Sequence, residues 1–183
     1  IPLGNFIVIG GYMEIKIAGK TWRKDFCADI IKRLGILTHI TKNNEADLFI
    51  ICDNKDIENE EILDYAKNGA SAIFLYPDPD VIKIFGNELM YTYHFPLIQL
   101  NINLPITFLQ VFPSISLIRQ KQGESIAYFA FDFSRSGENY TTKYPAVIWK
   151  EIGRGKIGIF MYDFIATVLL LLQGWEFFTS KGE

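Results

Sequence analysis

The sequence predicts an α/β domain in three layers, with a mostly parallel central sheet, helices on both faces and an antiparallel extension in the second half. Two observations carry this prediction. In the first half, continuous apolar runs such as DLFIICD and SAIFLY alternate with helical segments, which is typical of parallel strands buried on both faces. After Pro96 the helical period disappears, and short strand-like runs follow one another between prolines.

The chain is expected to open with two strands and a helix. Residues 5–10 form an apolar run ending in Gly-Gly, and residues 13–18 alternate apolar and polar side chains with the period of a strand. Thr21 is placed to cap the helix WRKDFCADIIKRLG, which Gly35 ends. The residues at helical spacing on the expected buried face are Trp22, Phe26, Ile30 and Leu34.

The remaining elements of the first half follow from the same patterns. Apolar runs predict strands over 37–41, 47–53 and 71–76. Residues 60–68 form an amphipathic pattern with acids in the first turn and Gly69 behind it, which predicts a helix. A short helical turn is expected over 81–85.

In the second half, the runs PLIQLNI, ITFLQVF, ISLIRQ and SIAYFAFDF predict antiparallel strands, and residues 134–143 predict a polar loop. The segment PAVIWKEIGRGKIGIFMYDF is typical of a hairpin that turns at Gly153-Arg154-Gly155. A Leu-rich helix ending near Gly174 follows. The similar segments IAYFAFDF and IGIFMYDF are interpreted as two neighbouring strands of one sheet.

Composition favours one globular domain over residues 1–183, because 49% of the residues are hydrophobic, 21% are charged and no linker interrupts the chain. The absence of an initiator Met indicates a processed chain or a piece of a longer protein.

The net charge of −3 gives no basic face for nucleic acid. No signal peptide is recognised, and Cys27 and Cys52 are interpreted as buried, reduced thiols, so a cytoplasmic location is expected.

The stretch over 157–178 is long enough to span a bilayer. However, Asp163, Gln173 and Glu176 interrupt it, and a charge in the middle of a spanning helix is costly. The pattern therefore favours a buried strand, KIGIFMYD, followed by a buried helix, FIATVLLLLQG. Membrane attachment through this helix is kept as a third hypothesis.

The segment GGYMEIKIAGKTW contains Gly-Lys-Thr between a strand and a helix, as a nucleotide-binding P-loop does. A P-loop requires a glycine five residues before Gly19, and this position is Glu14. A carboxylate there would repel phosphate, and the alternating pattern predicts a strand instead of a loop. Lys20 and Thr21 are therefore interpreted as a turn and a helix cap, and no nucleotide cofactor is expected.

No strong catalytic or metal-binding motif is recognised. Cys52 would need a base, and pairing it with His94 is a weak hypothesis, because His39 and His94 both lie in strand-like or aromatic surroundings. The histidines and cysteines lack metal-ligand spacing, so no metal is expected. Asp132 and Asp163 end the two similar strands, and neighbouring antiparallel strands would bring these two acids together as an acid pair.

Two segments carry a family resemblance: FLQVFPSISLIRQKQGESIAYFAFD and YPAVIWKEIGRGKIGIFMYDFIATVLLLLQG. With the order of elements, they resemble the class I glutamine amidotransferase-like superfamily. More narrowly, they resemble amidotransferase-like domains of carbohydrate-active proteins, such as those attached to polysaccharide deacetylases and the trimerisation domain of some β-galactosidases. The resemblance covers most of the chain and implies a flavodoxin-like fold.

The catalytic residues of a working glutaminase do not match. Such an enzyme has a Cys in a Gly-rich elbow after the strand that here reads SAIFLYPD, and Tyr76, Pro77 and Asp78 occupy this region. It also has a late His with an acid two residues on, and no His follows His94 in this sequence. The resemblance therefore implies a domain without glutaminase activity, and we name no catalytic residue.

The leading hypothesis is a non-catalytic binding or assembly domain associated with carbohydrate-active machinery. Its expected partners are a second copy of the chain, through the exposed aromatics of Tyr91 to Phe95, another domain of a longer protein, or a carbohydrate. The alternative is a hydrolase of carbohydrates or esters that uses carboxylates at the strand ends, where open α/β sheets bind ligands. It requires carboxylates that lie together and are not engaged in structural hydrogen bonds. The residues expected to line this crevice are Gly10, Gly11, Asp53, Tyr76, Asp78 and Asp163.

Overall fold

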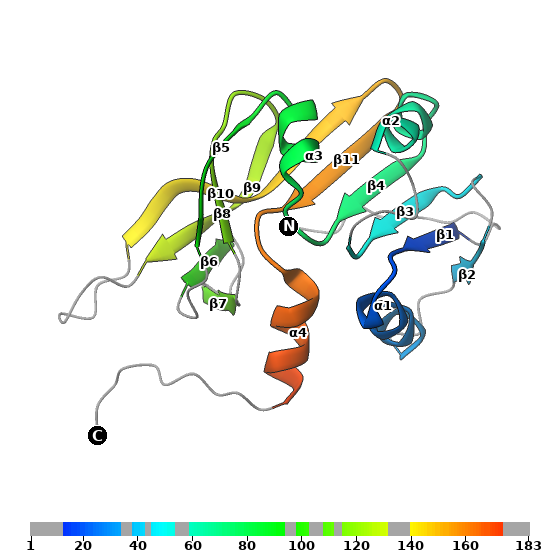
Figure 1. Cartoon of the computed structure of the whole chain (residues 1–183), viewed down its shortest axis with the longest axis horizontal. Coiled ribbons are helices and arrows are strands. Elements are labelled where there is room, and N and C mark those ends of the chain that lie inside the picture. Colours follow the sequence, from blue (N-terminus) through cyan, green and yellow to red (C-terminus); the bar gives the residue numbers. More distant parts are fainter. Residues whose placement is uncertain are drawn as a thin grey trace.

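The computed structural model describes residues 13–33, 38–42, 45–53, 59–93, 98–102, 108–111, 115–131 and 140–173 (Figure 1). Its first half contains β1 (Met13–Ala18), α1 (Trp22–Arg33), β2 (Thr38–Ile40), β3 (Leu48–Ile51), α2 (Asn59–Lys67), β4 (Ser71–Phe74) and α3 (Pro79–Ile84). Its second half contains β5 (Glu88–Tyr93), β6 (Ile98–Ile102), β7 (Phe108–Val111), β8 (Ile115–Arg119), β9 (Glu124–Phe131), β10 (Tyr140–Ile152), β11 (Gly155–Phe160) and α4 (Phe164–Leu172).

Within these residues, one sheet runs in the order β2-β1-β3-β4-β11-β10-β9-β6-β7. The strands from β2 to β11 are parallel, and those from β11 to β7 pair antiparallel. The order of the parallel half is the flavodoxin-like one, with β11 as its fifth strand. The predicted fold class is therefore confirmed, including the antiparallel extension. The predicted strand over 5–10 lies outside the described residues.

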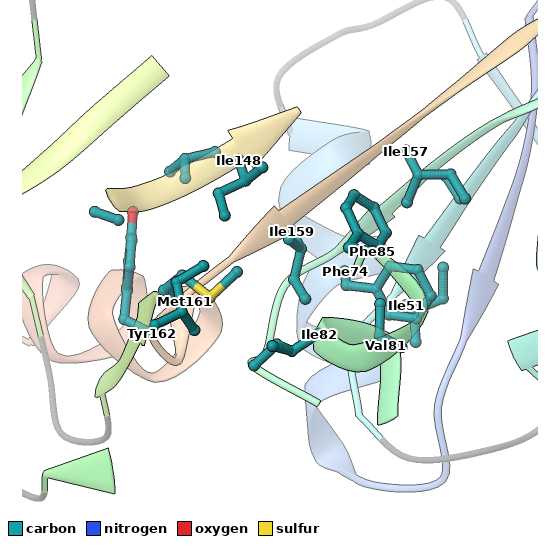
Figure 2. Packing of buried hydrophobic residues seen from close by; sticks show 14 of the residues in the cluster. Ile51, Phe74, Val81, Ile82, Phe85, Ile148, Ile157, Ile159, Met161 and Tyr162 are labelled. Carbon is teal, nitrogen blue, oxygen red and sulfur yellow. The ribbon is translucent and has the colours of Figure 1, made fainter. Parts of the chain in front are cut away.

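The first core cluster fills the face of the sheet that carries α2 and α3. In Figure 2, Ile51 of β3 and Phe74 of β4 lie beside Val81 and Phe85, which come from α3 and the residue after it. A separate ribbon of β5 and β8 contributes to the same cluster with Ile115, Leu117 and Ile118. This ribbon covers the antiparallel half, because it packs with Phe129 of β9 and Ile148 of β10.

The second cluster lies on the opposite face, beneath α1 and α4. It joins Ile15 and Ile17 of β1 to Ile31 of α1 and Ile165 of α4. Alternation along β3 explains the division, because Phe49 and Ile51 belong to the first cluster and Ile50 to the second. Figure 1 shows the resulting layers, with α2 and α3 on one side of the sheet and α1 and α4 on the other.

The predicted hairpin is confirmed. β10 and β11 pair from Val147 and Phe160 down to Ile152 and Gly155, and the turn is Gly153-Arg154. Gly153 has a φ of 61°, which favours glycine. The predicted division of the 157–178 stretch also holds up to residue 173. No helix among the described residues has the length and apolar character needed to cross a bilayer.

Three expectations were wrong in detail, and one strand was missed. Trp22 is 48% exposed, and the residues that α1 buries are Cys27 and Ile31, so its buried face is rotated from the predicted one. β10 begins at Tyr140, inside the segment predicted as a loop. β5 was not predicted, because its ELMYTY segment follows helical and turn residues without a clear alternation. The similar strands β9 and β11 are not neighbours, because β10 lies between them. Asp132, the proposed partner of Asp163 in an acid pair, lies outside the described residues.

Candidate functional site

The candidate site is the edge of the sheet where the parallel strands β1, β3, β4 and β11 end, which we call the strand-end edge. The segments that follow these strands are 19–21, 52–53, 75–78 and 161–163. Since all four strands are parallel, the four segments emerge on the same edge. The expected residues Asp53, Tyr76, Asp78 and Asp163 all belong to these segments. Gly10 and Gly11 lie outside the described residues.

Asp53 connects the end of β3 to the turn between β1 and α1. Its carboxylate accepts hydrogen bonds from the backbone N–H groups of Lys20, at 2.8 Å, and Thr21, at 3.2 Å, and from the Thr21 hydroxyl. Gly19, with a φ of 154°, allows this close approach, since a Cβ there would lie 3.0 Å from Asp53 Oδ1. From β1, the next strand, β2, lies on one side and the following strands, β3 and β4, lie on the other, so the strand order reverses between β1 and β3, which is where doubly wound folds bind their ligands. In this protein, Asp53 connects the two sides of this position, because it follows β3 and accepts hydrogen bonds from the turn after β1.

The Gly-Lys-Thr segment therefore has the predicted role of turn and helix cap. Thr21 immediately precedes α1, and its Oγ1 accepts a hydrogen bond of 3.3 Å from the backbone N–H of Arg23. The same hydroxyl donates to Asp53. The cap prediction for Thr21 is confirmed by these contacts.

Asp78 caps a different helix. Its Oδ1 accepts hydrogen bonds from the backbone N–H groups of Asp80, at 2.8 Å, and Val81, at 3.2 Å, in the first turn of α3. The Asp78 residue is only 7% exposed. Pro79 follows at the first helical position, where its missing N–H costs nothing. The carboxylate of Asp78 thus satisfies two helix donors.

Asp163 combines a cap with an ion pair. Its Oδ1 accepts from the backbone N–H of Ala166 at 3.0 Å, in the first turn of α4. Its Oδ2 lies 2.6 Å from Nη2 of Arg23, with the side chain of Asp163 3% exposed and that of Arg23 23% exposed. The Nε of Arg23 is buried and has no hydrogen-bond partner in the described structure. The pair therefore joins α1 to the start of α4. Among the nitrogens of the guanidinium, Nη2 has a hydrogen-bond acceptor in Asp163, whereas Nε has none in the described structure.

Arg23, the partner of Asp163, also contacts two aromatic rings. Its guanidinium carbon lies 5.0 Å from the ring centroid of Trp22 and 6.0 Å from that of Tyr76. These distances are typical of cation–π contacts. The indole of Trp22 contacts Phe26 edge-on, with the ring centroids 6.1 Å apart. We call Trp22, Arg23, Tyr76 and Asp163 the arginine cluster.

Two thiols lie beneath this part of the strand-end edge. Cys27 of α1 and Cys52, the residue after β3, belong to the same buried cluster. The hydrogen bond from Cys52 lowers the pKa of Cys27 despite the opposing effect of burial. The pKa of Cys52 is raised, first by its hydrogen bond with Cys27 and then by burial.

Across the described ranges, no group of three or more His, Cys, Asp and Glu side chains is placed to hold a metal ion. His94, the weakly proposed base for Cys52, lies outside those ranges. The structure thus associates the strand-end carboxylates with helix starts and an arginine.

Compared by sequence, the chain matches no protein-family model and no curated protein. Similar folds are found among solved structures. An exo-β-1,4-mannosidase from Opitutaceae bacterium strain TAV5 matches with a TM-score of 0.63 and 12% identity, over 91% of this chain and 34% of the mannosidase. The β-galactosidase from Bacillus circulans sp. alkalophilus matches with a TM-score of 0.60 and 10% identity, over 89% of this chain and 31% of the enzyme.

A cytoplasmic protein from Salmonella typhimurium LT2 also matches, with a TM-score of 0.54 and 10% identity, over 88% of this chain and 99% of that protein. The chain thus spans about a third of the two glycosidases and nearly all of the Salmonella protein. At these identities, the matches establish a shared fold. They do not test the amidotransferase-like resemblance, which stays a prediction.

Sequence reasoning placed Asp53, Tyr76, Asp78 and Asp163 at the strand ends but missed Arg23. Its partner Asp163 is 140 residues away, and no local pattern links the two. One signal was available: Arg23 stands at the second position of a predicted helix, where a cation opposes the helix dipole. A cation at that position needs a nearby anion, and the carboxylate of Asp163 supplies it.

Proposed function

We propose that the chain is a non-catalytic binding or assembly domain that works as part of carbohydrate-active machinery. The observation that carries the proposal is that Asp53, Asp78 and Asp163 each accept hydrogen bonds from backbone N–H groups at the start of a helix. A carboxylate engaged in this way holds the start of its helix, which is a structural role.

The carbohydrate association rests on the fold. The matched glycosidases are about three times longer than the segment this chain resembles, so the likeness concerns one part of each enzyme. A shared fold does not carry the chemistry of those enzymes over to this chain, so the proposal is limited to a binding or assembly role. The amidotransferase-like kinship and a cytoplasmic location, as in the Salmonella protein, belong to the same proposal.

The alternative hydrolase has less support. A glycosidase acid pair needs two carboxylates facing one substrate, separated by about 5 to 10 Å. At the strand-end edge, Asp53 faces the Lys20-Thr21 turn, Asp78 faces α3, and Asp163 faces Arg23 and α4. These three carboxylates hold three different helix starts, which is not the arrangement of an acid pair.

Turnover measurements test the absence of catalysis. The purified chain is incubated with nitrophenyl β-galactoside, nitrophenyl β-mannoside, nitrophenyl acetate and glutamine, beside Asp163→Asn and Asp53→Asn variants. We expect rates equal to those of buffer with all three proteins, and lower melting temperatures for the variants. A rate above buffer that Asp163→Asn abolishes, at an unchanged melting temperature, would favour the hydrolase instead.

Assembly is tested through exposed aromatic surface. Tyr91 of β5 is 59% exposed, and Tyr128 of β9 is 36% exposed beside Ile126, which is 48% exposed. Light scattering across a concentration series measures the mass of the wild type, of Tyr91→Ser and of a Ile126→Ser/Tyr128→Ser double variant. An oligomer that one of these changes dissociates supports assembly. A monomer at all concentrations leaves binding to β-linked galacto- or manno-oligosaccharides, measured by calorimetry, as the remaining form of the proposal.

A further inference from the structure

The arginine cluster combines an exposed aromatic surface with a charged group at the strand-end edge. Trp22 is the first residue of α1, and 48% of it is exposed although Arg23 and Phe26 contact its ring. Tyr76, which follows β4, is half-buried and contacts the same guanidinium. An indole is therefore accessible at the edge where open α/β sheets bind their ligands.

The guanidinium of Arg23 retains donors that its ion pair does not use. Asp163 divides its carboxylate, because Oδ1 accepts from the Ala166 N–H and Oδ2 accepts from Nη2 of Arg23. This division prevents the two-pronged pairing that arginine commonly makes with a carboxylate. Nε is buried without an acceptor in the described structure, and 23% of the side chain is exposed. A guanidinium has five N–H donors, so Arg23 can also donate to the oxygen of a ligand that lies beside Trp22.

The charges at this edge favour a neutral ligand. The charge of Arg23 is compensated by Asp163, and the carboxylate of Asp53 holds the turn immediately before Trp22. An anionic ligand would therefore meet two carboxylates and one guanidinium. A purely apolar ligand would cover the guanidinium and leave its free donors without water or an acceptor, which is costly.

A pyranose ring has both properties that this surface requires. Its C–H groups form an apolar face that can lie flat on an indole, and its hydroxyl oxygens accept hydrogen bonds from a guanidinium. A tryptophan side chain offers a large, rigid contact area at a low cost in conformational entropy. Stacking of this kind needs an open platform instead of an enclosed pocket.

We propose that the arginine cluster binds one pyranose unit of a neutral oligosaccharide, which stacks on Trp22 and accepts hydrogen bonds from Arg23. The inference rests on the proposed binding role and gives that role a place on the molecule. Asp163 acts as a positioning residue, because it holds Arg23 from beneath the edge. Since the platform covers one face of the sugar, we expect a dissociation constant on the order of 1 mM.

The experiment is a titration followed through the tryptophan indoles. The chain has three tryptophans, so the ¹H–¹⁵N spectrum of the full chain contains three indole signals, and Trp22→Phe identifies that of Trp22 by its loss. β-1,4-Mannotriose and β-1,4-galactotriose are added separately to the wild type. We expect one of them to shift the Trp22 signal in a saturable way.

Two changes at Trp22 test the stacking. Trp22→Ala should weaken binding by about tenfold or more, measured by calorimetry, because the aromatic face is lost. Trp22→Phe keeps a smaller aromatic face and should weaken binding less. Leu172→Ala is the control, since it removes another exposed apolar side chain, 69% exposed on α4, and should leave the dissociation constant unchanged. Melting temperatures confirm that each variant is folded.

The outcomes separate this inference from the proposed function. Sugar binding that Trp22→Ala leaves unchanged, or an oligomer that binds neither trisaccharide, would overturn the site while the proposed binding or assembly role stands. Turnover of a nitrophenyl glycoside would overturn the proposed function itself. A saturable shift confined to other indole signals also contradicts the site, so the wild-type titration decides the matter even if Trp22→Ala fails to fold.

Discussion

The guanidinium of Arg23 and the carboxylate of Asp163 form an ion pair, with Nη2 and Oδ2 2.6 Å apart, between residues 140 positions apart in the chain. Asp163 stands between the last strand and the last helix, and Arg23 stands in the first turn of the first described helix. The contact therefore ties the beginning of the described chain to its end, at the edge where the parallel strands finish.

Replacing both partners of this pair should cost less than the sum of the two single replacements. Asp163→Ala removes the cap of α4 and leaves Arg23 without its anion, and we expect a loss of roughly 3–5 kcal/mol in the free energy of unfolding. Arg23→Met leaves a buried carboxylate with the Ala166 N–H as its remaining contact described here. Urea unfolding of both single variants and of the double variant gives the coupling energy, expected at about 1–3 kcal/mol.

The exposed pair Arg33–Asp29 serves as the control for this cycle. Its side chains are 78% and 53% exposed, and its atoms are 2.7 Å apart. Arg33→Met should cost less than about 1 kcal/mol, because water screens an exposed pair. Equal effects at Arg23 and Arg33, or strict additivity between Arg23→Met and Asp163→Ala, would show that burial does not strengthen the first pair.

Removing the Asp53 carboxylate should loosen the turn before α1. Asp53→Ala deprives the Lys20 and Thr21 amides of their acceptor, and we expect a cost of roughly 1.5–3 kcal/mol. Hydrogen exchange at these two amides should accelerate. Asp53→Asn keeps one acceptor oxygen and should retain part of the stability. Unchanged exchange in Asp53→Ala would mean that the turn is held by other contacts.

Gly155 should tolerate no side chain. A Cβ at this position would overlap the carbonyl oxygens of Ala70 and Ala66, where the β10–β11 hairpin meets the end of α2. Gly155→Ala is therefore expected to cost more than about 3 kcal/mol or to prevent folding, since overpacking moves the backbone. The neighbouring Lys156→Ala, on an exposed side chain, is the control and should change stability by less than about 1 kcal/mol. Circular dichroism during heating compares the two.

Tyr162 should make stability fall at high pH. Burial raises the pKa of Tyr162 above its ordinary value of 10.0. Above pH 10 the unfolded chain loses this phenol proton while the folded chain keeps it, so unfolding becomes easier as pH rises. The contribution is complete below pH 10 and decreases by at most about 1.4 kcal/mol per pH unit above it. Tyr162→Phe should show a shallower decline than wild type in urea unfolding between pH 9 and pH 11, and parallel declines would contradict the assignment.

The parallel half of the fold was predictable because its signals are local. Residues 48–51 are largely buried on both faces, and in 71–74 the buried Ala72 and Phe74 alternate with half-buried residues. Uninterrupted apolar runs reveal such strands directly. The hairpin partner of β11, β10, was predicted, but its parallel partner, β4, was not predictable, because this pairing joins segments more than eighty residues apart. Sequence periodicity gives the faces of an element but not its neighbour across the sheet.

The site shows the same division. The rule that parallel strands end on one edge placed Asp53 and Asp163 correctly at that edge. What each carboxylate does there depends on which donors approach it. Asp78 precedes Pro79 and a helical pattern, so its cap is a local feature that the sequence itself indicates. The contacts of Asp53 with the β1–α1 turn and of Asp163 with Arg23 required the folded chain.

The position of β11 has a consequence for synthesis on the ribosome. This strand is the last of the described strands to be made, yet it lies between β4 and β10 in the middle of the sheet. Until residues 155–160 leave the exit tunnel, β4 and β10 both present unpaired backbone edges, which are templates for pairing with other chains. The nascent chain therefore depends on rapid completion, and a product truncated before Gly155 should aggregate instead of forming a smaller stable domain.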